Sequence, residues 1–125
     1  MDNGARALEG RALLVVEDEY LIAADMTFIL EEMGAEVLGP AHSVATALDL
    51  IEKHGERLDG AILDINLGNE QVFPVADLLR SRKVPFIFST GYDASVIPEA
   101  YAGIPRCEKP FDKALVATLL HSVAF

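Results

Sequence analysis

The sequence has a single cysteine, few basic residues and no long apolar segment. Because Cys107 is the only cysteine, no disulfide can form within the chain, which is typical of a protein of the reducing cytoplasm. No apolar segment approaches the length of about 20 residues that a membrane-spanning helix needs. We therefore expect a cytoplasmic chain that does not enter a membrane.

Basic residues are half as frequent as acidic ones: 10 Lys and Arg stand against 20 Asp and Glu, and the formal net charge is -10. Nucleic acid and anionic lipid both require a basic surface, so the composition argues against either as a partner. An excess of carboxylates favours a bound cation, or a partner protein with a basic patch.

The chain has 125 residues, of which 51% are hydrophobic, and this is enough for one domain with a sizeable core. The first ten residues lack the apolar centre of a signal peptide. We expect a flexible leader over residues 1–10 and one domain over residues 11–125.

Continuously apolar segments alternate with amphipathic segments along the chain. Apolar segments without polar alternation are typical of parallel strands that are covered on both faces. Strands are expected over 12–16, 36–39, 61–64, 85–90 and 105–108. Helices are expected over 20–33, 44–54, 74–83 and 112–123, with at best a weak helix over 94–103, which Pro98 interrupts. Pro40 is expected to stop the second strand, and Asn66, Gly68 and Asn69 to open a turn after the third.

This alternation predicts an α/β fold with a doubly wound, five-stranded parallel sheet and helices on both faces. At this length the flavodoxin-like strand order 2-1-3-4-5 is the natural choice. In that order the first and third strands are neighbours, and ligands bind outside the carboxyl ends of such strands.

Polar side chains gather at those carboxyl ends. Glu17 and Asp18 follow the first strand, Asp64 ends the third, Thr90 ends the fourth, and Lys109 follows the fifth. Two carboxylates about 4 Å apart repel by roughly 4 kcal/mol at an effective dielectric of 20, so the acids require either a raised pKa or a cation. Oxygen-only ligands with open positions favour Mg²⁺, and the lack of His or Cys at the strand ends argues against zinc.

A metal ion, a lysine and a hydroxyl form a set that binds phosphoryl groups, and a carboxylate beside them can act as the nucleophile. Asp64 is thus a candidate acyl-phosphate site. The chain has no Gly-rich GxxxxGK[ST] loop, so a nucleotide is not the obvious phosphate source.

Together, these residues and the run Lys109-Pro110-Phe111 resemble the receiver domain of two-component response regulators, from about Ala12 to Val123. The resemblance implies that Asp64 accepts a phosphoryl group from a sensor histidine kinase or a histidine phosphotransfer protein. It implies a Mg²⁺ site formed by Glu17, Asp18, Asp64 and the backbone carbonyl of Asn66. It also implies a cis bond between Lys109 and Pro110.

One subgroup of receivers, nicknamed FAT GUY, is more similar still, on the run Phe88-Ser89-Thr90-Gly91-Tyr92. Receivers usually carry an aromatic switch residue three places before the lysine, and here that place is Arg106. We therefore expect the 91–104 segment to be the mobile element. Tyr92 either shields the phosphorylated site or packs.

Each of these residues also has a simpler interpretation. Glu17 and Asp18 could cap the first helix, Thr90 could belong to a turn, and Lys109 could be a solvated surface residue. Cys107 is expected to be a small buried hydrophobe. The three histidines are expected to be structural or solvated and to lie away from the acids: His42, His54 and His121.

The final helix carries no charged residue after Lys113, and its apolar residues cannot all face one sheet. The remainder predicts a contact with a partner or a second copy, unless the chain's own terminus covers it. As a stand-alone receiver, the chain would signal to a protein partner through the 91–104 and 106–123 surface, or act as a phosphate sink.

Two other classes of protein share part of this pattern. A phosphoaspartyl hydrolase of the haloacid dehalogenase type needs a second carboxylate two residues after the nucleophile, where this chain has Asn66. A pseudo-receiver that binds partners without phosphorylation is disfavoured by the complete set of acids, threonine and lysine.

Overall fold

The computed structural model describes residues 7–91 and 97–123, which form a sheet with helices on both sides. The main strands are β1 (Ala12–Val16), β2 (Glu36–Ala41), β3 (Gly60–Asp64), β6 (Phe86–Thr90) and β7 (Arg106–Glu108). The short strands β4 (Asn66–Leu67) and β5 (Glu70–Gln71) form a separate hairpin. The helices are α1 (Tyr20–Glu32), α2 (Val44–His54), α3 (Phe73–Ser81) and α4 (Lys113–Val123). Two 3-10 turns cover Gly55–Arg57 and Glu99–Tyr101.

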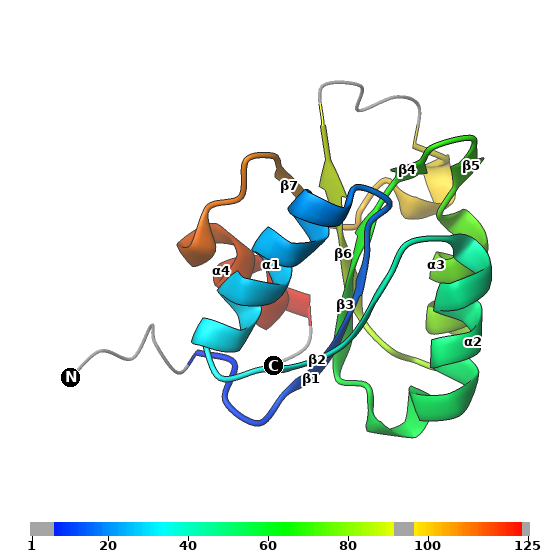
Figure 1. Cartoon of the computed structure of the whole chain (residues 1–125). Coiled ribbons are helices and arrows are strands. Elements are labelled where there is room, and N and C mark those ends of the chain that lie inside the picture. Colours follow the sequence, from blue (N-terminus) through cyan, green and yellow to red (C-terminus); the bar gives the residue numbers. More distant parts are fainter. Residues whose placement is uncertain (1–6, 92–96, 124–125) are drawn as a thin grey trace.

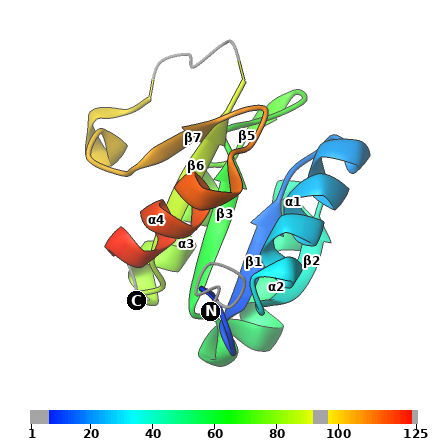
Figure 2. The ribbon, with the colours of Figure 1, turned by 90° about the vertical axis from the view of Figure 1, so that its left-hand side faces the viewer.

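The five main strands are parallel and lie in the order β2-β1-β3-β6-β7. This order confirms the predicted 2-1-3-4-5 arrangement and the doubly wound, flavodoxin-like fold. Figure 1 shows α1 and α4 on one face of the sheet and α2 and α3 on the other, and Figure 2 shows the same layers from the side. All five carboxyl ends therefore lie at one edge, as the site prediction requires.

The central strands are apolar throughout because both of their faces are covered. Every residue of β1, β3 and β6 is buried. Successive side chains of β1 alternate between two separate cores: Leu14 and Val16 pack with α2 and α3, whereas Leu13 and Val15 pack with α1 and α4. Among the described residues, no helix has the length and hydropathy needed to cross a bilayer.

Strand β2 departs from the prediction that Pro40 would end it. The strand continues through Pro40 to Ala41, and the Gly39–Pro40 peptide bond is cis. Because β2 is an edge strand that pairs only with β1, the missing N–H of Pro40 leaves no ladder partner unsatisfied.

Two loops also differ from expectation. The turn expected after the third strand is present at Gly68-Asn69, but the short strands β4 and β5 that flank it were not predicted, and Asn66 pairs with Gln71. The weak helix expected over 94–103 is reduced to the 3-10 turn at Glu99–Tyr101 in the part that the structure describes, while residues 92–96, including Tyr92, lie outside it.

The predicted leader, 1–10, is packed at its end. Leu8 is fully buried in the core under α1 and α4, and its N–H donates to the carbonyl oxygen of Met33. Residues 7–10 thus belong to the domain, and the prediction of a flexible leader is wrong for these four positions.

Truncating Leu8 tests whether residues 7–10 pack against the domain. Leu8→Ala is expected to lower the free energy of unfolding by about 2–5 kcal/mol, because it removes a buried side chain and leaves a cavity. Leu115→Ala is the matched control, since Leu115 is 43% exposed, and it is expected to cost less than about 0.5 kcal/mol. Urea denaturation measures both, and equal effects would show that Leu8 does not pack as described.

Candidate functional site

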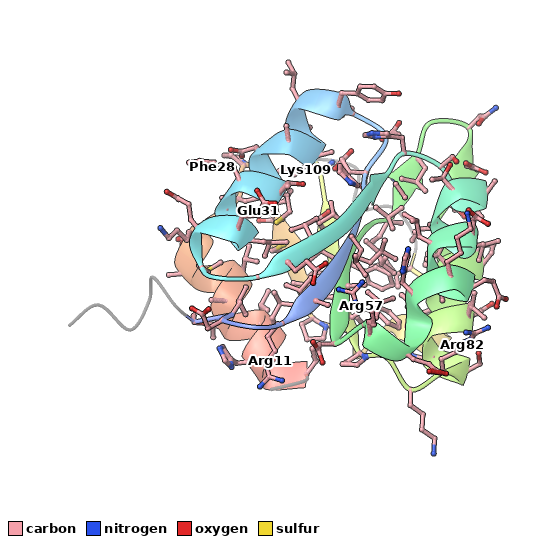
Figure 3. The ribbon with its side chains drawn as sticks, turned by 60° about the horizontal axis from the view of Figure 1, so that its bottom comes forward. Arg11, Phe28, Glu31, Arg57, Arg82 and Lys109 are labelled. Atoms are coloured by element: carbon pink, nitrogen blue, oxygen red, sulfur yellow. The ribbon has the colours of Figure 1, made fainter. Side chains whose placement is uncertain are left out.

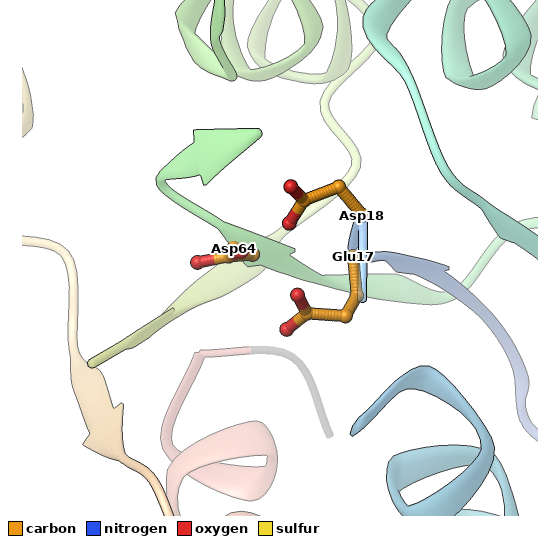
Figure 4. A group of neighbouring side chains, drawn as sticks. All are labelled: Glu17, Asp18 and Asp64. Atoms are coloured by element: carbon orange, nitrogen blue, oxygen red, sulfur yellow. The ribbon is translucent and has the colours of Figure 1, made fainter. Parts of the chain in front are cut away.

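Three carboxylates meet where β1 and β3 end. Glu17 and Asp18 follow β1, Asp64 is the last residue of β3, and one oxygen from each lies within 4.8 Å of the others (Figure 4). Glu17 is 2% exposed and Asp64 4%, whereas Asp18 is partly open to solvent. The acids therefore converge as the strand order predicted.

Lys109 completes the cluster from the end of β7. Its Nζ lies 2.8 Å from Oε1 of Glu17 and 3.4 Å from Oδ2 of Asp64. The backbone N–H of Lys109 donates to the carbonyl oxygen of Thr90, and the Lys109–Pro110 peptide bond is cis, as expected. The lysine is thus a partner of the acids and not a solvated surface residue.

The environment keeps a proton on Asp64. Burial of the carboxyl, its hydrogen bond to Glu17 and the charge of Glu17 raise the pKa of Asp64 to about 8, against the opposing effect of Lys109. Burial lowers the pKa of the Lys109 ammonium. The hydrogen bond with Glu17 and the charge of Asp64 outweigh this effect, so the pKa is raised. The cluster therefore holds more negative charge than one lysine compensates.

A divalent cation fits this deficit. The cluster offers carboxylate oxygens alone, which suit a hard ion such as Mg²⁺. Oε1 of Glu17 is buried and accepts no well-oriented hydrogen bond, its contact with Lys109 being an ion pair. A buried carboxylate oxygen with spare capacity is what a metal ligand requires.

The remaining predicted residues lie beside this cluster. Thr90 ends β6 and is 3% exposed, and Asn66 follows Asp64 by two positions in β4. The hydroxyl role of Thr90 and the metal-binding carbonyl of Asn66 stay predictions. Cys107 is buried, as expected, with its Sγ 3.6 Å from the carbonyl oxygen of Phe88, and burial raises the pKa of its thiol to about 11.

His42 was expected to lie away from the acids, and this is wrong. Its Nδ1 is 2.9 Å from the carbonyl oxygen of Glu17, and its ring stacks on Tyr20 with centroids 3.9 Å apart. No local pattern marks this contact, because it joins positions that are far apart in sequence. His121 does lie away from the acids, near the carbonyl oxygen of Ala7.

The place of the usual aromatic switch differs as the sequence predicts. Arg106 is exposed in β7 opposite Phe88, whereas Tyr101 is 5% exposed and stacks on Phe73 with ring centroids 5.5 Å apart. The guanidinium of Arg80 covers Tyr101 at 4.4 Å. Tyr101, from the 97–104 stretch, thus packs its ring against Phe86 and Phe88 of β6. The mobility of residues 91–104 stays a prediction.

Apolar surface is left over on two helices. On α4 only Leu115 is strongly exposed among the large apolar residues, whereas α1 exposes Tyr20 (70%), Leu21 (87%) and Phe28 (59%). Figure 3 labels Phe28 on the outside of α1. Beside α1 lies an open hollow of about 310 Å³. It is lined by Tyr20, Ala24, Thr27, Phe28, Glu31, Pro40 and His42. The sequence predicted exposed apolar surface on the last helix only. The more exposed apolar surface, on α1, was not predicted.

No family model matches the chain. It is 34% identical over 122 residues to the phyllosphere-induced regulator PhyR of Methylorubrum extorquens, covering 90% of this chain and 43% of that protein. The chain therefore spans less than half the length of this curated relative.

Two solved structures match over nearly their full length. The solution structure of SdrG from Sphingomonas melonis shares 38% identity with a TM-score of 0.81, covering 93% of this chain and 96% of that chain. A response regulator receiver protein from Sinorhizobium medicae shares 25% identity with a TM-score of 0.76, covering 92% of this chain and 94% of that chain.

Proposed function

Because the chain belongs to the response regulator receiver domains, a signalling family with a CheY-like fold, we propose that Asp64 accepts a phosphoryl group from a histidine kinase or phosphotransfer protein. One observation carries the proposal. The Asp64 carboxylate at the end of β3 lies 3.4 Å from the Lys109 ammonium, inside a cluster of three acids.

The residues divide the transfer between them. Asp64 acts in its ionised form, which bound Mg²⁺ would favour over the protonated one. One of its oxygens attacks phosphorus while the P–N bond of the phosphohistidine breaks, and the departing imidazole takes up a proton from solvent. Lys109 turns from the carboxylates to the phosphoryl oxygens, and Thr90 donates a hydrogen bond to them. Glu17, Asp18, Asp64 and the Asn66 carbonyl would hold Mg²⁺, which neutralises charge on the transferred group.

Asp64 lies at the edge of the sheet where α1 also begins, and we place the approach of the phosphodonor there. The exposed Tyr20, Leu21 and Phe28 and the hollow beside them support contact with such a protein there. We keep the 91–104 and 106–123 surface as the proposed output region toward a downstream partner or a second copy. Stand-alone action and a phosphate-sink role also remain proposals.

The subgroup assignment is part of this proposal. It rests on the run from Phe88 to Gly91, which ends β6 with a buried Thr90, and on the absence of an aromatic residue at Arg106. The buried Tyr101 supports a coupling between β6 and the surface through this ring, in place of the usual aromatic switch three residues before the lysine.

Mass spectrometry of the intact protein tests the function. With Mg²⁺ and acetyl phosphate, the chain is expected to gain the mass of one phosphoryl group, and excess EDTA is expected to prevent the gain. A chain that binds Mg²⁺ but stays unmodified with both acetyl phosphate and phosphoramidate would contradict the proposal and favour the pseudo-receiver.

A further inference from the structure

We infer that His42 and Glu70 are positioning residues for the acid cluster, and that both act through residues 41–44, between β2 and α2. We call this stretch the 41–44 junction. The inference rests on the proposed function, since it concerns the affinity of the cluster for Mg²⁺. Neither residue contributes an oxygen to the cluster itself.

The junction first fixes the end of β1. The N–H of Glu17 donates to the carbonyl oxygen of Ala41 at 2.9 Å, and the carbonyl oxygen of Glu17 accepts from Nδ1 of His42 at 2.9 Å. A carbonyl can only accept, so Nδ1 carries the proton. Both backbone polar groups of Glu17 are thus bound by adjacent junction residues, at the point where Glu17 and Asp18 leave the sheet.

The ring of His42 is itself held in place. It stacks on Tyr20 with an interplanar angle of 24°, and Tyr20 is the first residue of α1. His42 therefore contacts the turn between β1 and α1 at both ends, at Glu17 and at Tyr20, on either side of Asp18. Such outer contacts orient metal ligands and raise metal affinity.

The junction also fixes the hairpin that follows Asp64. Oε2 of Glu70 accepts from the N–H of Val44, the first residue of α2, at 3.0 Å. Glu70 pairs with Leu67 across the hairpin, and the N–H of Val72 donates to the carbonyl oxygen of Ile65 at its base, 3.0 Å away. A displacement of Glu70 would therefore also move β4, which begins at Asn66.

The hairpin forms a wall of the cluster. At its tip, Gly68 has a φ of +70°, and a Cβ added there would lie 3.5 Å from Oδ2 of Asp18. The tip thus approaches the carboxylate that is most open to solvent. One short junction consequently sets the distance between the acids after β1 and the hairpin after β3.

Magnesium affinity distinguishes positioning from simple structural support. Glu70→Ala and His42→Ala are each expected to weaken Mg²⁺ binding about tenfold, measured by calorimetric titration of the full chain. Glu70→Gln keeps an oxygen acceptor and His42→Asn keeps an N–H donor near the position of Nδ1. Each is expected to recover most of the affinity, to within about threefold of the unmodified chain.

Two controls remove comparable contacts elsewhere. His121→Ala removes a ring nitrogen that lies 2.8 Å from the carbonyl oxygen of Ala7, and Glu36→Ala removes a surface carboxylate paired with Arg57. Both are expected to keep Mg²⁺ affinity within about twofold of the unmodified chain, because neither side chain borders the cluster. Amide chemical shifts of Asp18 and Gly68 in metal-free protein provide a second readout, and should move in the His42 and Glu70 alanine variants only.

The outcomes separate the two proposals. If the alanine variants bind Mg²⁺ as the controls do and the two amide shifts stay fixed, the positioning role is overturned and the proposed function stands. If the unmodified chain binds no Mg²⁺, the proposed function fails, and unmoved amide shifts would then overturn the positioning role as well. An alanine variant that does not fold is replaced by its glutamine or asparagine counterpart, which must show a smaller change in the same direction.

Discussion

Asp64→Asn is expected to abolish phosphorylation by acetyl phosphate and Mg²⁺. The amide is close in size to the carboxylate but has no anionic oxygen to attack phosphorus, and it also removes one charge from the metal cluster. No other carboxylate of the described residues is both buried in the cluster and in contact with Lys109 except Glu17, which Lys109 contacts at 2.8 Å. Intact mass after incubation measures the loss.

The control makes the same chemical change on the surface. Asp77 is exposed on α3, and Asp77→Asn is expected to leave the yield of phosphorylated protein unchanged. Continued modification of the Asp64 variant would place the phosphoryl group elsewhere. Peptide mapping of the product would then identify the acceptor and show whether Glu17 takes over.

The stability of the metal-free protein should fall as pH rises, because the folded state holds a proton on Asp64 that the unfolded state has released. The pKa of Asp64 is raised from 3.8 to about 8 by burial and by Glu17. Between these values the folded chain binds more protons, so the free energy of unfolding decreases by up to about 1.4 kcal/mol per pH unit. We expect a total loss of roughly 2–4 kcal/mol between pH 5 and pH 9. Lys109, whose pKa is raised above 10.5, stays charged throughout and adds nothing to this slope.

Asp64→Asn and added Mg²⁺ identify the source of this slope. The Asp64 variant has no carboxyl to ionise there, so its stability in EDTA should be nearly flat over this window and exceed that of the unmodified chain at pH 9. Mg²⁺ binds the ionised acids, so its stabilisation of the unmodified chain should grow with pH. Urea titrations at pH 5, 7 and 9 measure these effects, and parallel slopes for the two proteins would assign the pH dependence to other groups.

The parts of the fold that the sequence could predict are those written into local patterns. Uninterrupted apolar segments such as Ala12–Val16 predict strands buried on both faces, and the structure has β1 at those bounds. Helix caps are also local features: Ser43 accepts from the N–H of Thr46 at the start of α2, and Asp112 accepts from the N–H of Ala114 at the start of α4. The approach of Glu17, Asp18 and Asp64 followed from strand order, since neighbouring parallel strands end at one edge.

Contacts between distant segments escaped the prediction because nothing local specifies them. The hydrogen bond of His42 to Glu17 spans 25 positions, and that of Glu70 to Val44 spans 26. Pro40 can lie within a strand because β2 is at the sheet edge, where no partner strand requires a hydrogen bond from its nitrogen. Local propensity does not reveal that a strand is at the edge. The hairpin did have a signal, the pair Gly68-Asn69 at a two-residue turn, but two-residue strands are too short for a periodicity to show.

The sheet divides the interior into two cores, and the exposed α1 residues belong to neither. Leu21 and Phe28 can therefore change identity without disturbing the packing that keeps the chain folded, whereas Tyr20 also stacks on His42. If the proposed phosphodonor docks on this face of α1, its recognition and the integrity of the domain rest on separate sets of side chains. A family built on this plan can diversify its signalling connections by altering the outside of one helix.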